Sequence, residues 1–141
     1  MIVGVGIDVV DVTSFAEQLA APGSAFATGT FRASERRDAR EAGAGDEATR
    51  LAARFAAKEA FVKAWSSGAW GRPPRLNHVD PTEVEVVRDA WGRPTLRLHG
   101  VVAAAVGALG EVRAHLSLSH DGPVAVATVV LERIASTEAT P

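Results

Sequence analysis

Hydrophobic and polar residues alternate with a period of two near both ends of the chain, and this pattern predicts β-strands there. In the segment 2–10, one face holds Val3, Val5, Ile7 and Val9. Asp8 falls on the opposite face together with Gly4 and Gly6. A second alternating segment begins at Val112 and leads into the turn Asp121-Gly122. The segment 123–131 is the expected partner strand across that turn.

Start and stop signals between these strands predict four helices. The helices are expected near residues 13–21, 34–42, 47–65 and 101–109. Thr13 or Ser14 caps the first, and Ser14 with Glu17 has the spacing of a capping box. The third is the clearest, because it is dense in Ala, Leu, Arg and Lys and ends at Ser66-Ser67-Gly68.

The rest of the pattern predicts a hairpin and a fold class. Residues 69–81 carry three prolines and form a loop or flap, whereas 83–87 and 95–98 are strands joined by a tight turn. Consecutive strands joined by tight turns favour an α+β fold, an antiparallel sheet with helices packed on one side. We expect a single domain over residues 1–133, followed by a frayed tail at 134–141.

The composition favours a globular domain and argues against several other classes of protein. The 141 residues are 47% hydrophobic and 23% charged, which is typical of a globular domain. Fifteen Lys and Arg against 17 Asp and Glu argue against a nucleic-acid partner. The chain has no cysteine, which excludes disulfides and thiolate sites and fits a reducing cytoplasm. No apolar run approaches the roughly 20 residues that span a bilayer, so no membrane contact is expected.

Asp8 is the first candidate for chemistry, because a charge within an apolar strand is unfavourable unless a partner or a metal compensates it. Gly4 and Gly6 on its face leave room for a ligand to approach the backbone. The alternative is an aspartate at a frayed strand end that caps the next turn.

Glu59 supplies a second carboxylate from the long helix. It projects along the same stripe as Phe55 and Val62, so it faces inward or into a cleft. With Lys63 it could instead form a surface pair worth roughly 0.2 to 0.5 kcal/mol. Two acids from separate elements, beside Arg54, Lys58 and Lys63, suit a magnesium and phosphate site, since magnesium needs only one or two carboxylates plus phosphate oxygens.

His120 lies in the late segment Ser117-Leu118-Ser119-His120-Asp121, where a strand ends at a turn. Side chains at such a position can reach a cleft. Ser, His and Asp so close in sequence do not form a catalytic triad, because triad partners must converge in space. His120 could equally hydrogen-bond the turn.

Three segments together give the chain a recognisable resemblance. They are Gly4-Val5-Gly6-Ile7-Asp8-Val9-Val10, Arg54-Phe55-Ala56-Ala57-Lys58-Glu59-Ala60-Phe61-Val62-Lys63-Ala64 and Leu116-Ser117-Leu118-Ser119-His120-Asp121. In order and separation they resemble the holo-[acyl-carrier-protein] synthases, the small 4'-phosphopantetheinyl transferases. A hairpin with Gly92-Arg93-Pro94 is also similar to that family's pattern. The resemblance covers nearly the whole chain.

The resemblance implies transfer of phosphopantetheine from coenzyme A to a serine of apo acyl carrier protein, with release of 3',5'-ADP, in fatty acid biosynthesis. It implies Asp8 and Glu59 as magnesium ligands and Lys63 beside the diphosphate. Arg54 and His120 would hold phosphates of the nucleotide end. Glu59 and Lys63 are then the catalytic candidates, although Glu59, a metal-bound water or a carboxylate of the carrier could each accept the serine proton.

The short members of this family are homotrimers, so the resemblance also implies coenzyme A bound between neighbouring subunits. Gly92 and Pro94 would then be adenine contacts from an adjacent subunit, although an ordinary turn also explains them. Many members carry an arginine just after the opening strand to meet the acidic carrier, whereas this chain has Thr13-Ser14-Phe15. Carrier recognition would then rely on other cations, and the candidates are Arg32, Arg36, Arg37 and Arg40.

Those arginines could also form an ordinary solvated helix face, and the natural acceptor could be a carrier domain within a large fatty-acid synthase. Two other functions stay open at this point. One is a subunit that binds coenzyme A or a carrier protein without catalysis, and the other is a magnesium-dependent phosphoester hydrolase that uses water in place of serine.

Overall fold

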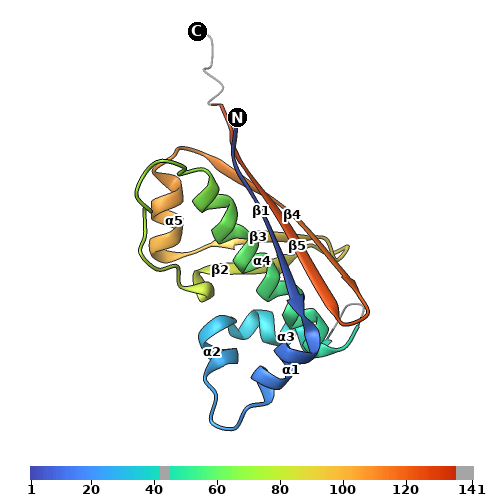
Figure 1. The fold of residues 1–141 in the computed structure, drawn as a ribbon. Helices are drawn as coiled ribbons and strands as arrows, with labels where there is room; N and C mark the ends of the chain where they lie inside the picture. Colours follow the sequence, from blue (N-terminus) through green and yellow to red (C-terminus); the bar gives the residue numbers. More distant parts are fainter. Residues whose placement is uncertain (42–44, 136–141) are drawn as a thin grey trace.

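The structure is a computed structural model that describes residues 1–41 and 45–135. Figure 1 shows the arrangement of its elements. The helices are α1 (Val12–Ala20), α2 (Phe26–Thr30), α3 (Ala33–Glu41), α4 (Glu47–Ser67) and α5 (Gly100–Gly107), with a 3₁₀ turn at Pro81–Glu83. The strands are β1 (Ile2–Asp11), β2 (Val84–Arg88), β3 (Pro94–Leu98), β4 (Val112–Asp121) and β5 (Val124–Arg133).

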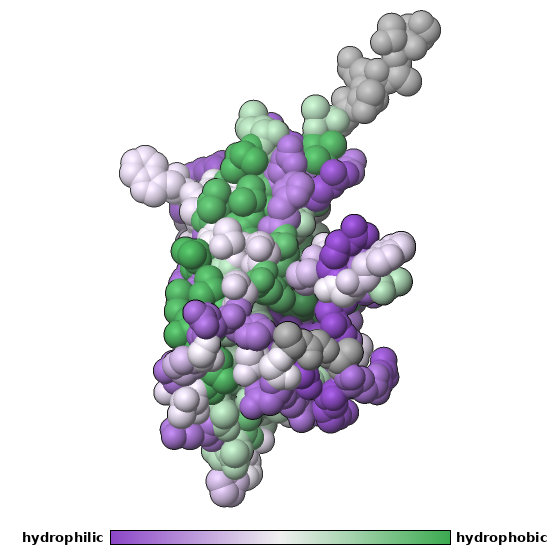
Figure 2. All heavy atoms as spheres, turned by 90° about the vertical axis from the view of Figure 1, so that its right-hand side faces the viewer, coloured by the Kyte–Doolittle hydropathy of each residue, from purple (hydrophilic) through white to green (hydrophobic). Residues whose placement is uncertain are grey.

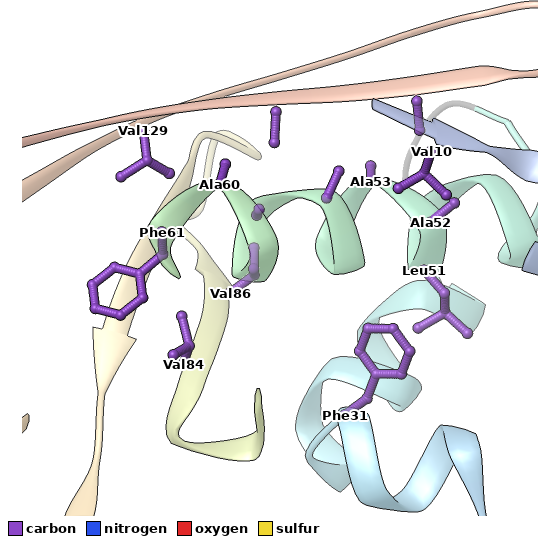
Figure 3. Packing of buried hydrophobic residues seen from close by; sticks show 14 of the residues in the cluster. Val10, Phe31, Leu51, Ala52, Ala53, Ala60, Phe61, Val84, Val86 and Val129 are labelled. Carbon is purple, nitrogen blue, oxygen red and sulfur yellow. The ribbon is translucent and has the colours of Figure 1, made fainter. Parts of the chain in front are cut away.

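The strands form two antiparallel sheets, one with the order β1-β5-β4 and one with the pair β2-β3. The pairing brings the two chain ends together, since Ile2 lies opposite Glu132. Helix α4 packs on one face of the larger sheet, and Figure 3 shows it between the strand that carries Val129 and the strand that carries Val84 and Val86. The α+β class, the hairpin and the placement of helices on one side of the sheet are confirmed.

Small residues let β1 approach α4 closely. The helix buries alanines along this contact, among them Ala60 and Ala64, with no exposed surface. A Cβ atom on Gly6 would lie 1.9 Å from the Ala60 carbonyl oxygen, and one on Gly4 would lie 1.8 Å from that of Ala64. Both glycines are therefore required by contact with the helix backbone.

We expect Gly6→Ala to destabilise the fold by at least about 2 kcal/mol, because the added methyl meets rigid backbone rather than a flexible side chain. Urea unfolding midpoints measure the effect. Gly29→Ala in α2 is the matched control, since its Cβ would have nothing within 4 Å. Equal destabilisation by the two substitutions would show that the close contact is not the cause.

The structure corrects the prediction for the first helix. Helix α1 begins at Val12, and its cap is Asp11, whose side chain accepts a hydrogen bond from the Ser14 amide at 2.8 Å. The prediction of Thr13 or Ser14 as the cap and of a Ser14–Glu17 capping box was wrong. The reason is that β1 stays paired through Asp11, opposite Val124, and the chain turns directly into the helix.

Helix α2 was not predicted, and contacts distant in sequence explain it. The ring of Phe26 packs edge-on to that of Phe15 at 5.7 Å between centroids and also meets Phe55 of α4. Helix α4 also extends two residues further than predicted, to Ser67. The predicted end of the second helix at Ala42, part of the loop 43–46 and most of the tail 134–141 lie outside the described residues.

In the part of the chain that the structure describes, no helix covers the outer face of the three-stranded sheet (Figure 1). Val5, Ile7 and Val9 of β1 are exposed there by 54%, 56% and 61%. The register continues this face across β5 to the exposed side chains of Ser117 and Ser119 on β4. Figure 2 views the molecule from this side and shows hydrophobic side chains gathered in a band. Such an apolar strip on a sheet is typical of an interaction surface.

No helix within residues 1–41 and 45–135 is both long and apolar enough to cross a bilayer.

Candidate active site

Asp8, Glu59 and Lys63 lie together where β1 meets α4. The Lys63 ammonium donates to the Asp8 carboxylate at 2.7 Å and to the Ile7 carbonyl at 3.0 Å. The Asp8 side chain is only 15% exposed, whereas that of Lys63 is 55% exposed. Asp8 is therefore not a frayed capping residue, and Lys63 pairs with Asp8 rather than forming only a helix surface pair with Glu59.

Glu59 is half-buried beside this ion pair. Burial raises the pKa of the Glu59 carboxyl above its usual range, the negative charge of Asp8 raises it further, and the Lys63 charge opposes both effects. Two carboxylates close enough to perturb one another are a site where a cation lowers the energy of the ionised pair.

A raised pKa gives Glu59 a defined effect on stability. The protonated form is the one that the fold favours, so its contribution is complete below the unfolded pKa of about 4.3 and is lost as the pH rises through the folded value. Without magnesium, we expect Glu59→Gln to melt at a higher temperature than wild type at pH 7, and the difference to vanish as the pH approaches 4. Differential scanning calorimetry measures this, with exposed Glu111→Gln as the control.

The donor set of this cluster fits magnesium. Carboxylate oxygens are the ligands that this ion prefers, and one or two suffice when phosphate oxygens and water complete the shell. Among the described residues no group of three or more His, Cys, Asp or Glu side chains could hold a metal ion. A cation at Asp8 and Glu59 would therefore take its remaining oxygens from water or a substrate.

A cavity of about 560 Å³ opens beside Glu59. Its walls come from α4 and from the proline-rich segment that follows it, and they include Val62, Trp65, Leu76 and Val79. The Trp65 indole nitrogen is buried and has no hydrogen-bond partner among residues 1–41 and 45–135. The cavity therefore offers apolar contact with one unused donor close by.

A second cavity, of about 350 Å³, gathers the other predicted residues. Arg54, Gly92, Pro94 and His120 all line it. The hairpin turn that carries Gly92 has positive φ at this glycine, and no atom lies near the position of a Cβ. The turn brings Gly92 and Pro94 to the same hollow as the His120 end of β4, so these four residues converge although they are distant in sequence.

The two cavities share no lining residue within one chain. Glu59 belongs to the first and Arg54 to the second, although both are on α4. Five residues along a helix correspond to about 500° of rotation, which places them on different faces. One chain thus presents two separate regions, one with the carboxylates of Asp8 and Glu59 beside a cavity that Arg72 and Arg75 also line, and one with the cations Arg54 and Arg88. These regions are termed the acidic and the cationic half-site.

Comparisons with known proteins show the family of the chain. Residues 4–127 match the family described as the 4'-phosphopantetheinyl transferase superfamily. The chain belongs to the 4'-phosphopantetheinyl transferase superfamily. The resemblance predicted from the three sequence segments is confirmed, and with it the assignment of the chain as an enzyme of the transferase class.

Relatives match over almost the whole chain. Holo-[acyl-carrier-protein] synthase of Nocardia farcinica is 47% identical over 131 residues, which are 93% of this chain and 88% of that protein. The synthase of the same name from Mycobacterium ulcerans is 48% identical over 131 residues, 93% of this chain and 97% of that protein. A solved Chronobacterium ammoniagenes ACPS-CoA complex is 46% identical with a TM-score of 0.85, covering 93% of this chain and 97% of that one.

Lys58, one of the helix cations expected at a phosphate site, is buried in the interior instead. Lys58 is 1% exposed, and its ammonium donates to Glu35 at 2.8 Å and to the carbonyls of Pro81 and Val84 at 2.8 and 2.6 Å. These three acceptors use all three of its protons. Lys58 therefore joins α3 and the start of β2 to α4 and is not available to a substrate.

Sequence reasoning missed other residues of the transferase's cationic cavity. Arg50 and Arg88 line it, as do Ser117 and Ser119 of β4. Ser117 and Ser119 belong to the same segment, residues 117–121, in which the sequence indicated His120 as a candidate. Nothing in the sequence around Arg88 indicated a place in this cavity. Its position opposite Pro94 in the hairpin follows from the β2-β3 register.

Proposed function

We propose that this chain transfers the 4'-phosphopantetheine arm of coenzyme A to a serine of an apo acyl carrier protein, in a magnesium-dependent reaction that releases 3',5'-ADP. The reaction class follows from membership of the family. The observation that carries the proposal is the cluster of Asp8, its ion-pair partner Lys63 and the neighbouring Glu59, which lines a cavity.

In the proposed site, Asp8 and Glu59 hold magnesium. When bound, the ion neutralises charge that develops on the phosphoryl oxygens. Lys63 is the exposed member of its pair with Asp8, so its ammonium can turn to the diphosphate once a cation takes over the carboxylate. The apolar walls around Val62 and Leu76 suit the pantetheine arm, and the Trp65 indole can donate to one of its amide carbonyls.

The second cavity suits the nucleotide end of coenzyme A. Arg54 supplies positive charge to phosphate oxygens, and a ring nitrogen of His120 can donate a hydrogen bond to them. Gly92 and Pro94 form an uncrowded wall against which an adenine ring can lie.

We place coenzyme A between subunits of a homotrimer. A single chain carries its two half-sites in separate cavities, which a substrate with two ends can bridge across an interface. The exposed strip of Val5, Ile7 and Val9 on the sheet is the surface that a neighbouring copy would cover.

The carrier protein is proposed to dock on α3. Two of the three acids of this helix turn toward the interior, Glu35 to Lys58 and Asp38 to Arg54, whereas Glu41 at its end is exposed. Arg36, Arg37 and Arg40 have no ion pair within residues 1–41 and 45–135. An acidic partner would complement them. Arg32, a further candidate, instead donates to the Thr82 carbonyl at 2.8 Å and is less available.

We further place the reaction in fatty acid biosynthesis in the cytoplasm. The absence of cysteine suits a reducing compartment. The acceptor is a free acyl carrier protein or a carrier domain of a fatty-acid synthase.

Intact-mass spectrometry tests the function. An apo carrier protein incubated with the chain, coenzyme A and magnesium should gain the mass of the arm, roughly 340 Da, as expected for a group-carrier cofactor. Binding without any covalent gain would instead indicate a non-catalytic subunit. Release of 3',5'-ADP in a control without carrier would indicate a hydrolase.

A further inference from the structure

A third cavity, of about 360 Å³, lies beyond the one proposed for the pantetheine arm. The two cavities have four lining residues in common, at the end of α4 and in the segment that follows it. These residues are Trp65, Ala69, Arg72 and Arg75. The third cavity therefore continues the first one past the end of α4.

The length of the pantetheine arm brings its sulfur to this third cavity. Ser67, the last residue of α4, follows Glu59 by eight residues, which correspond to about 12 Å along the helix axis. The roughly thirteen bonds between phosphorus and sulfur span about 15 Å when extended, because three backbone bonds of a peptide span about 3.5 Å. An arm that starts at the cluster of Asp8 and Glu59 and follows α4 thus ends where the third cavity begins. A group attached to the sulfur would lie inside it.

The walls of the third cavity combine apolar contact with positive charge. Val3 of β1 and Leu109 after α5 supply apolar surface. Arg72, Arg75 and Arg133 line the same cavity, and no acidic residue of the described chain does so. This composition suits a short carbon chain that carries a negative charge.

The three arginines have no carboxylate partner within residues 1–41 and 45–135. Arg72 donates from one terminal nitrogen to the Gly68 carbonyl at 3.0 Å, and Arg133 donates from one to the Met1 sulfur at 3.6 Å. Most of their donors are therefore free for an anion. Hydrogen bonds between a guanidinium and a carboxylate are roughly twice as strong as those between neutral groups.

Trp65 lies at the junction of the two cavities and provides an independent indication of a ligand. The residue is 7% exposed, and its indole nitrogen has no hydrogen-bond partner in the described chain. A buried donor without an acceptor is unfavourable. An amide or thioester carbonyl that passes from the first cavity to the third would satisfy it.

We propose that the third cavity is an acyl subsite, which takes a short acyl group carried on the sulfur of coenzyme A and favours one that ends in a carboxylate. This inference rests on the proposed function and names the donor class of the same site. The thioester takes no part in the reaction. The serine loses its proton to the base of the site, and its oxygen forms a bond to phosphorus. The bond from that phosphorus to 3',5'-ADP breaks, and the acylated arm reaches the carrier intact.

Two donors of equal acyl length test the proposal, glutaryl-coenzyme A with a terminal carboxylate and pentanoyl-coenzyme A without one. We expect kcat/KM of wild type to be about tenfold higher for the glutaryl donor, and Arg133→Gln to bring the ratio close to one. Arg133 lines only the third cavity, so transfer from unacylated coenzyme A should stay as in wild type. Arg97→Gln is the matched control, since Arg97 is exposed and lines neither cavity.

Ala108→Trp tests the place of the acyl group independently of charge. Ala108 is exposed just after α5 and lines only the third cavity, so a bulky side chain there fills the cavity without entering the core. We expect kcat/KM to fall about tenfold for both acyl donors and to stay unchanged for coenzyme A. Isothermal titration calorimetry without a carrier should give the same order of affinities, which does not depend on transfer.

Equal use of the two acyl donors by wild type, or an unchanged ratio in folded Arg133→Gln, would overturn the proposal. A rise in KM for the carrier that is the same with every donor would also overturn it, because the arginines would then serve the carrier. Should Arg133→Gln not fold, Ala108→Trp and the wild-type comparison still decide it. Failure of the proposed function would instead appear as no transfer from coenzyme A itself by wild type.

Discussion

Asp8→Ala is expected to reduce transfer of the phosphopantetheine arm by at least about a hundredfold, the usual loss when a charge-stabilising group leaves an active site. Asp8 is the acid that β1 contributes, and Glu59 alone offers one carboxylate for magnesium. The substitution also frees Lys63 from its 2.7 Å ion pair. The initial rate of carrier modification, followed by intact-mass spectrometry at saturating magnesium, measures the effect.

The fold should survive this change. The pair between Asp8 and Lys63 has one exposed partner, and such pairs contribute about 1 kcal/mol or less to stability. The circular dichroism spectrum and melting temperature of Asp8→Ala should therefore stay close to those of wild type. Glu111→Ala, which removes an exposed acid, is the control for charge. Wild-type turnover by a folded Asp8→Ala protein would refute the metal site.

Mixing two inactive variants is expected to restore activity. Asp8→Ala disables the acidic half-site, and His120→Glu places a carboxylate in the cationic cavity. If the two half-sites meet across subunits, a trimer that contains both variants has about one third of its sites intact, because only one of its interfaces joins an intact acidic half to an intact cationic half. Differently tagged chains that are co-expressed and purified through both tags provide the sample for the transfer assay.

The control for this experiment is a mixture in which both variants damage the same half. Asp8→Ala with Lys63→Met should stay inactive, because Asp8 and Lys63 belong to one chain and one cluster. If the first mixture is as inactive as the second, the site lies within a single chain and the shared arrangement is wrong. Sedimentation velocity establishes in the same samples that the chains have associated.

The site residues that could be predicted from sequence had a local signature. Asp8 interrupts an alternating apolar strand, and Glu59 lies on the inward stripe of a long helix, so each was unusual in its own segment. The structure brings both to one place, as the family resemblance implied. Gly92 and Pro94 came from the resemblance alone, whereas His120 also stood out at the end of a strand. The convergence of the three depends on the hairpin and β4 meeting in space.

Other features could not be predicted because they depend on partners distant in sequence. Lys58 and Arg54 look alike as helix cations, yet Lys58 finds Glu35 and two carbonyls in the interior whereas Arg54 faces a cavity. Helix α2 owes its existence to the rings around Phe26. The cap at Asp11 depends on where β1 stops pairing with β5.

The glycine contacts of β1 also bear on which cation the enzyme can use. Gly6 is two residues from Asp8, and the carbonyl that it touches belongs to Ala60, next to Glu59. The span between the two acids is thus set by how closely strand and helix backbones approach, not by the acids themselves. Redesign for a larger ion such as calcium would begin with the residues that space β1 from α4 and leave both ligands unchanged.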